Sequence, residues 1–162
     1  FNIMGPLTNP AGAQCQLVGV YAPQLTEIAA DVLGKVGAKR ALVVHGHDGM
    51  DEITLTGPTR VSEWDGEQVK TYDVSPGDAG IAEAPIAELI GGTPEDNAKI
   101  LRSILGGEKG PARDVVLLNA SAALMAAGKV ENLTEGVAMA AESIDSGKAS
   151  GALDRLIEVS NE

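Results

Sequence analysis

The residues best suited to chemistry in this 162-residue chain follow the apolar run 41–44. They are residues 45–52, with the sequence HGHDGMDE, which contains two histidines, two glycines and three acidic residues. An apolar run of this kind is typical of a buried strand. In open α/β sheets, ligands bind beyond the carboxyl ends of the strands. Carboxylates at such a place suit a hard divalent cation and favour Mg2+ in contact with a phosphorylated substrate.

Asp51 and Glu52 are the candidate metal ligands. Where a strand passes into a loop, two adjacent carboxylates can reach one ion, either directly or through water. Mg2+ keeps several of its waters and often takes only one or two protein carboxylates together with substrate phosphates. The alternative is a solvated acidic turn, which composition alone favours because short motifs match by chance so often.

The two histidines of the same segment have no assigned role. His45 and His47 could ligate a metal or transfer protons, but their spacing is not that of a zinc site. A polar strand end is the simpler interpretation for both. Asp48 and Gly49 fit a tight turn in which Gly49 supplies a positive φ.

Composition restricts the partners and the compartment. The chain has 12 basic and 23 acidic residues, for a formal net charge of −11. This charge argues against a nucleic-acid partner, because backbone binding depends on Lys and Arg that neutralise phosphates. The lone Cys15 excludes an internal disulfide, fits a reducing cytoplasm and is expected to be a small buried residue. No apolar run is long enough for a membrane span and no signal peptide is recognisable, so we expect a cytoplasmic protein without a membrane partner.

The elements around the acidic segment predict an α/β fold. Strand-like residues 16–21, a helical pattern over 23–36 and the strand 40–45 form a βαβ unit, which implies a parallel sheet. Asp65-Gly66 is a strong hairpin signal between two β-rich runs, 59–64 and 67–73.

The rest of the chain is helical. Further helices are predicted at 93–105, 112–127, 132–146 and 148–159, with caps at Thr93 and Asn132. We therefore expect a central, mostly parallel sheet with flanking helices and a β-hairpin insertion.

Other motifs give weaker signals. The proline-containing loop 5–12 is stiff, and it is either a shaped wall for a planar ligand or an ordinary connection. No GxGxxG or GxxxxGK[ST] loop is present. Gly91-Gly92-Thr93 precedes a helix and could bind an anion, but the acidic residues that follow favour a cap. Asn119 and Ser121, on an Ala-rich helix, suggest local polar packing.

Three segments resemble signatures of the anthranilate phosphoribosyltransferase family. Residues 1–11 (FNIMGPLTNPA) resemble its FN-x-LGPLTNPA signature, and residues 43–52 (VVHGHDGMDE) are similar to its VVHG-x-DGLDE segment. Residues 91–97 (GGTPEDN) resemble its GGTPEEN stretch. The order and spacing fit, and the resemblance covers essentially the whole chain but only about the C-terminal half of such an enzyme.

The resemblance implies a reaction and a fold. The family transfers the phosphoribosyl group of phosphoribosyl pyrophosphate to the amine of anthranilate, with release of pyrophosphate, in tryptophan biosynthesis. Its large domain is α/β and related to the pyrimidine nucleoside phosphorylases, and a small helical domain forms the usual homodimer. On this basis residues 1–162 are the C-terminal portion of the α/β domain, without the helical domain and the start of the α/β domain. Phe1, which is not an initiator Met, agrees with this expectation.

The resemblance also assigns residues. It implies that Asp51 and Glu52 hold an Mg2+ ion that bridges to the pyrophosphate, and that Gly5 and Pro6 lie against the anthranilate. No protein nucleophile is expected. The family's glycine-rich phosphoribosyl pyrophosphate loop, its KHGNR segment and its anthranilate-binding arginine belong upstream of Phe1, so we expect the chain alone to be inactive.

Three alternatives remain open. One is an enzyme similar to the pyrimidine nucleoside phosphorylases. Another is a non-catalytic paralogue that binds nucleic acid, although the charge of −11 and the acidic pair speak against it. A purely structural fragment is the third, and it is compatible with the transferase assignment.

Overall fold

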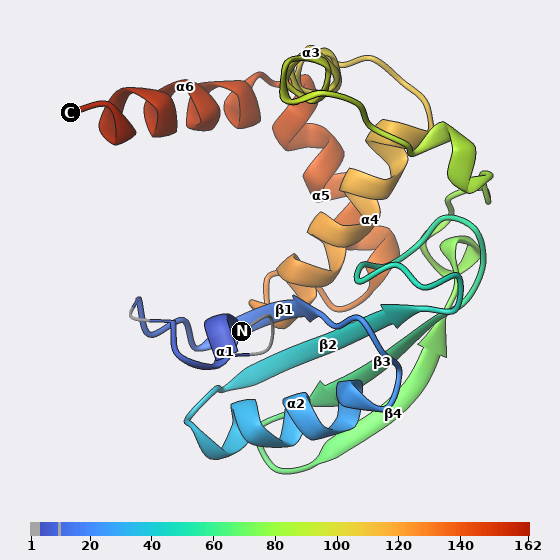
Figure 1. The fold of residues 1–162 in the computed structure, drawn as a ribbon, viewed down its shortest axis with the longest axis vertical. Coiled ribbons are helices and arrows are strands. Elements are labelled where there is room, and N and C mark those ends of the chain that lie inside the picture. The colour runs from blue at the N-terminus through green and yellow to red at the C-terminus, as the bar shows by residue number, and fades with distance from the viewer. Residues whose placement is uncertain (1–3, 10) are drawn as a thin grey trace.

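A four-stranded sheet and a group of helices make up the computed structural model, which describes residues 4–9 and 11–162 (Figure 1). The strand order is β1-β2-β3-β4. The bounds of the strands are β1 Cys15–Gly19, β2 Arg40–Gly46, β3 Thr59–Trp64 and β4 Val69–Val74. The bounds of the helices are α1 Met4–Leu7, α2 Leu25–Lys35, α3 Pro94–Leu105, α4 Pro111–Ala126, α5 Leu133–Asp145 and α6 Lys148–Ser160, with short 3-10 turns at Pro76–Ala79 and Ile86–Glu88.

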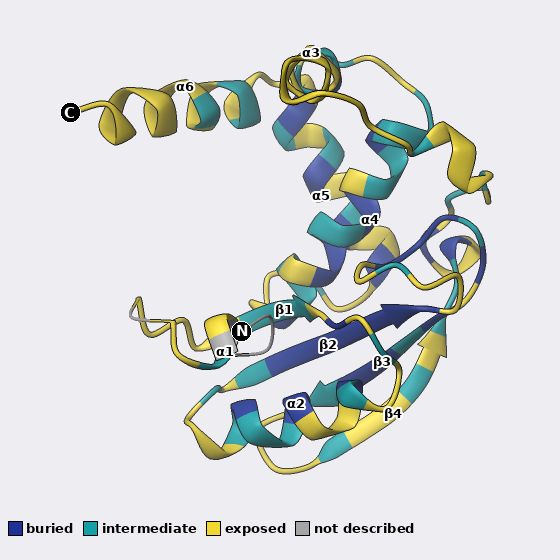
Figure 2. Ribbon diagram, in the orientation of Figure 1, coloured by how far each residue is buried: buried dark blue, intermediate teal, exposed yellow. Residues whose placement is uncertain are grey.

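Strand β2 is the centre of the fold and is buried along most of its length (Figure 2). Successive side chains of a strand point to opposite faces of the sheet. Ala41 and Val43 accordingly pack with α2, whereas Leu42 and Val44 pack with α4. A strand covered by helices on both faces needs a continuous apolar run, and this is why the sequence pattern of residues 41–44 predicted it.

The expectation of a mostly parallel sheet is wrong for these four strands. Only β1 and β2 pair in parallel, while β2–β3 and β3–β4 are antiparallel. For β3 and β4 the reason is their short connection, since a tight turn can join only antiparallel neighbours. In this turn the Asp65 carboxylate accepts the N–H groups of Glu67 and Gln68, and Gly66 has a φ of 105°. The predicted hairpin is therefore confirmed, but it extends the sheet rather than standing apart as an insertion.

The predicted helix starts are confirmed by their caps. The Thr93 hydroxyl accepts the Asp96 N–H, and the Asn132 side chain accepts the Glu135 N–H. Helices α4 and α5 pack against each other and are joined by the Arg113–Asp145 ion pair at 2.7 Å. The outer helix α6 is largely exposed (Figure 2).

Two further observations concern single features. Cys15 is exposed at the first position of β1, so the expectation that it is buried is wrong.

Among the described residues, no helix combines the length and apolarity that crossing a membrane requires.

Candidate functional site

The acidic loop, residues 47–58, leaves the carboxyl end of β2 and leads into β3. Its first part is a tight turn in which the Gly49 N–H bonds the Gly46 carbonyl at 2.9 Å and the Gly46 N–H bonds the Met50 carbonyl at 2.8 Å. Gly49 has a φ of 98°, which confirms the predicted positive φ at this position. This turn follows the end of β2 and leads directly into Asp51 and Glu52.

Asp48 serves as the internal brace of this loop. Its carboxylate accepts the Thr54 hydroxyl at 2.6 Å, the Thr56 hydroxyl at 2.8 Å and the Met50 N–H at 3.1 Å. Partial burial opposes its ionisation, but these hydrogen bonds prevail and lower the pKa of Asp48. Its lone pairs are therefore engaged within the loop, and Asp48 is a structural carboxylate rather than a free ligand.

Asp51 and Glu52, by contrast, are exposed and uncompensated. Within residues 4–9 and 11–162, neither carboxylate has a hydrogen bond or an ion pair. Partial desolvation, reinforced by the neighbouring Asp51 carboxylate, raises the pKa of Glu52. Such a pair gains from a cation that offsets its negative charge.

The donor set suits Mg2+ better than a metal enclosed by protein ligands. The described part of the chain holds no group of three His, Cys, Asp or Glu side chains arranged to hold an ion. Mg2+ requires few protein ligands because water and substrate phosphates complete its octahedron. The residues present therefore fit an open Mg2+ site of two carboxylates.

Gly19, at the end of β1, lies against the acidic loop and was missed by the sequence analysis. A Cβ atom at this position would overlap the backbone carbonyl of Asp51. The backbone of the acidic loop thus lies directly against the end of β1, and only glycine permits this approach. A glycine inside the predicted strand 16–21 was the available signal, because glycine within a strand often marks a close backbone approach.

Asn119, in α4, also contacts the acidic loop. Its side-chain oxygen accepts the Ile53 N–H at 2.9 Å, and its side-chain nitrogen donates to the Ile53 carbonyl at 2.9 Å. The same nitrogen donates to the Val115 carbonyl at 3.0 Å. The sequence suggested only local polar packing, because no short-range pattern indicates a partner 66 positions away.

The histidines contribute to the frame around the site. The buried His45 places Nδ1 2.7 Å from the Val20 carbonyl, which ties β2 to the segment after β1. Because a carbonyl can only accept, Nδ1 carries the proton. The exposed His47 places Nε2 3.4 Å from Asp73 in β4.

The other predicted part of the site, Gly5 and Pro6, belongs to α1. Gly5 is exposed, and among the described residues no atom beyond its chain neighbours and its own helix lies within 4 Å of a Cβ built on it. Of the signature over residues 1–11, positions 1–3 and 10 and the side chains of Met4 and Pro6 lie outside the described residues. Figure 1 shows α1 near the amino end of β1, whereas the acidic loop follows the carboxyl end of β2. The described chain therefore does not bring Gly5 together with Asp51 and Glu52.

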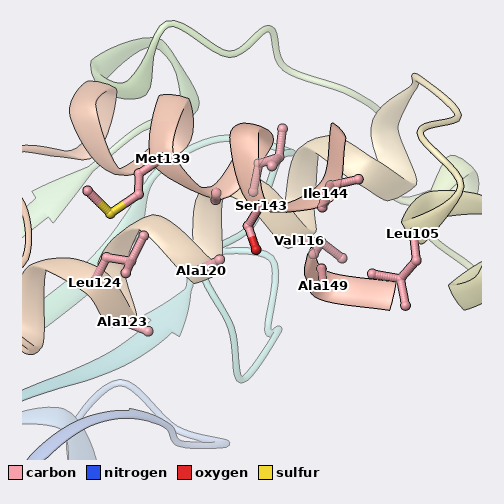
Figure 3. A pocket seen from close by; sticks show the side chains of 11 residues that line it. Leu105, Val116, Ala120, Ala123, Leu124, Met139, Ser143, Ile144 and Ala149 are labelled. Carbon is pink, nitrogen blue, oxygen red and sulfur yellow. The ribbon is translucent and has the colours of Figure 1, made fainter. Parts of the chain in front are cut away.

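A hollow of about 510 Å³ lies between α4 and α5 and is lined almost entirely by apolar side chains (Figure 3). Val116, Leu124 and Met139 contribute to its wall, and Ser143 is its one hydroxyl. The described residues that line it include no acidic, basic or imidazole group, so they offer no acid–base or metal-binding chemistry.

Comparison with known families identifies the family of this chain. Residues 1–150 match the family described as "Glycosyl transferase family, a/b domain". The chain belongs to this family. Its acidic loop, its βαβ unit and the helices up to α5 all fall within the matched part of the glycosyl transferase domain.

Curated relatives are similar along almost the entire chain. The anthranilate phosphoribosyltransferase of Moorella thermoacetica is 54% identical over 97% of this chain and 46% of its own length. That of Syntrophobacter fumaroxidans is 57% identical over the whole chain and 48% of its own length. The chain thus spans about half the length of the curated relatives it matches.

Solved structures show the same fold. The anthranilate phosphoribosyltransferase of Thermus thermophilus superposes with a TM-score of 0.86 and 46% identity, over 94% of this chain and 45% of that one. The enzyme of Saccharomyces cerevisiae in complex with PRPP (phosphoribosyl pyrophosphate) and Mg has a TM-score of 0.87 and 30% identity, over 96% and 45% of the two chains.

Proposed function

We propose that this chain is the C-terminal portion of the α/β domain of an anthranilate phosphoribosyltransferase. In the complete protein it would take part in the transfer of the phosphoribosyl group of phosphoribosyl pyrophosphate to the amine of anthranilate, in tryptophan biosynthesis. The proposal is supported by relatives of that name at 54–57% identity that are about twice as long as this chain. The observation that carries it is the uncompensated Asp51–Glu52 pair at the carboxyl end of β2.

Each part of the acidic loop has a role in this proposal. Asp51 and Glu52 supply the negative charge that would hold Mg2+, and Asp48 fixes the turn that presents them. When bound, Mg2+ supplies electrostatic stabilisation of the negative charge that develops on the departing pyrophosphate. The exposure of both carboxylates leaves room for a phosphorylated substrate.

The acceptor needs positioning rather than activation. As pyrophosphate leaves, the ribose carbon becomes cation-like, and an amine held in line can attack it without a protein nucleophile. We propose that Gly5 and Pro6 form one wall for the planar anthranilate. The other groups that contact both substrates would come from the half that relatives carry beyond the matched region, together with the helical domain that forms the homodimer.

Loss of anthranilate fluorescence on mixing with phosphoribosyl pyrophosphate and Mg2+ tests the proposal. The assay compares the 162-residue chain with a protein extended at its amino end by the half that relatives carry. We expect turnover only in the extended protein. Turnover by the chain alone would overturn the proposed need for the second half.

A matched variant tests the metal assignment in the same assay. Asp51→Ala in the extended protein should reduce the rate by at least about tenfold and leave folding nearly unchanged, because the side chain is exposed and has no partner among the described residues. An unchanged rate with an ordinary Mg2+ dependence would contradict the assignment. If the folded, extended protein is silent, phosphate-dependent cleavage of pyrimidine nucleosides becomes the assay of choice, since that activity is the nearest alternative for the fold.

A further inference from the structure

The side chain of Asn119 makes a two-point contact with a single residue of the acidic loop. Its amide oxygen accepts the Ile53 N–H and its amide nitrogen donates to the Ile53 carbonyl, both at 2.9 Å. A primary amide offers a donor and an acceptor side by side in one plane, as a neighbouring strand would. Asn119 thus replaces a strand partner for Ile53, which is itself buried.

The contact between Asn119 and Ile53 lies next to the carboxylates, because Ile53 directly follows Glu52. On the other side of the pair, the backbone of Asp51 lies against Gly19 at the end of β1. The two acidic residues are therefore held between β1 and α4, although their own side chains have no partner in the part of the chain that the structure describes. The third hydrogen bond of Asn119, to the Val115 carbonyl one helical turn earlier, fixes the orientation of the amide.

We propose that Asn119 is a positioning residue, which orients the Asp51 and Glu52 carboxylates for a divalent cation by holding the backbone of Ile53. This inference rests on the proposed function, since it assumes that the pair binds Mg2+. Groups that orient metal ligands from behind commonly change metal affinity by 10- to 100-fold when they are removed.

The test uses two variants in the full-length protein that contains this chain. Asn119→Leu keeps the size of the side chain and removes all three hydrogen bonds, while Asn119→Ala also removes the packing. Ile144→Val serves as a control, because Ile144 packs in the same helix pair near Leu117 without contact to the loop. Ser121→Ala removes a hydroxyl of the same helix that bonds only the Leu118 carbonyl and serves as a second control.

Two readouts separate positioning from general stability. Hydrogen exchange of the segment that contains Ile53 should become faster in both Asn119 variants and not in the controls. The dissociation constant for Mn2+, measured by electron paramagnetic resonance, should rise by at least tenfold in both variants. The controls should keep the Mn2+ affinity of the parent, even where the melting temperature falls equally.

The outcomes distinguish this inference from the proposed function. If Asp51→Ala weakens Mn2+ binding and Asn119→Leu does not, the positioning role is wrong and the metal site stands. If Asp51→Ala leaves Mn2+ binding unchanged, the metal assignment falls and the positioning role falls with it. Weaker Mn2+ binding in both Asn119 variants, together with faster exchange at Ile53, supports the inference.

Discussion

The acidic loop has three carboxylates within five residues, and they differ in their hydrogen bonding. Asp48 is saturated by the Thr54 and Thr56 hydroxyls and by a backbone N–H, and these bonds lower its pKa. Asp51 and Glu52 have no such partners, and the pKa of Glu52 is raised. The sequence showed that the three acidic residues are close together, but it could not show which of them is bonded within the loop. That difference depends on Thr54 and Thr56, which come later in the loop.

Neutralising Glu52 should make the metal-free protein more stable at neutral pH. A raised carboxyl pKa means that folding favours the protonated form, so the charged form weakens the fold as pH rises through that pKa. Glu52→Gln removes this charge and should raise the melting temperature without Mg2+ by about 1–2 °C. Calorimetry with and without Mg2+ checks this, and any stabilisation by Mg2+ should shrink in the variant. A lower melting temperature without Mg2+ would contradict the argument.

Gly19→Ala should displace the acidic loop. Its Cβ would overlap the Asp51 carbonyl, so the backbone must move, at a cost of about 1–3 kcal/mol in the free energy of unfolding. Urea denaturation measures the loss, and Mn2+ binding should weaken in parallel. Gly151→Ala is the matched control, because that glycine lies in α6 with open space around it and should tolerate a methyl group or gain stability. Equal effects of the two changes would argue against a close approach at Gly19.

At the scale of elements, the frame of the site depends on how α4 is fixed. One end of α4 carries Arg113, which is only 2% exposed and donates to Asp145 at the end of α5. Further along, Asn119 contacts the loop. The pairing of α4 with α5 therefore sets where Asn119 stands relative to β2.

Asp145→Asn should loosen this helix pair. The hydrogen bond from Arg113 lowers the pKa of Asp145, so the stability it adds is present above its ordinary value of 3.8 and is lost as pH falls through the lowered pKa. The variant leaves a buried guanidinium poorly compensated and should melt roughly 3–6 °C lower at pH 7, with a weaker loss on acidification. Thermal melts between pH 2 and 7 check this. Glu142→Gln is the control, because its ion pair with Lys148 is exposed and should matter little.

The sequence could predict elements that depend on local rules. The capped starts of α3 and α5, the Asp65-Gly66 turn and the buried strand 40–45 follow from near neighbours. The antiparallel pairing of β2 with β3 and the Asn119–Ile53 contact could not be predicted, because they depend on residues brought together by the tertiary structure. Within the candidate site, the position of the acidic pair was therefore predictable and its support was not.

For the whole molecule, a net charge of −11 restricts which polymers can approach. Its 12 basic residues are outnumbered by 23 acidic ones, and several of them already form ion pairs within the fold. Binding to phosphate backbones is driven by counterion release when Lys and Arg neutralise phosphates, and this chain has few basic side chains for that purpose.

We therefore expect no complex with single-stranded DNA in a gel-shift titration at low salt, where electrostatic attraction is strongest. Adding 5 mM Mg2+ should not produce one. A shifted band that disappears as salt is raised would instead favour the nucleic-acid-binding alternative over the transferase.

The exposed thiol at the start of β1 has a practical consequence. Cys15 is the one cysteine and Trp64 the one tryptophan of the chain. Cys15, in β1, pairs with Arg40 of β2, and Trp64, in β3, pairs with Ala41 of β2. The two residues therefore lie on the two strands that flank β2. Two strand spacings separate them by roughly 10 Å. A dye attached to the thiol would accept energy from the indole most strongly while β1 stays docked, so a fall in this transfer would report the separation of β1 from the sheet.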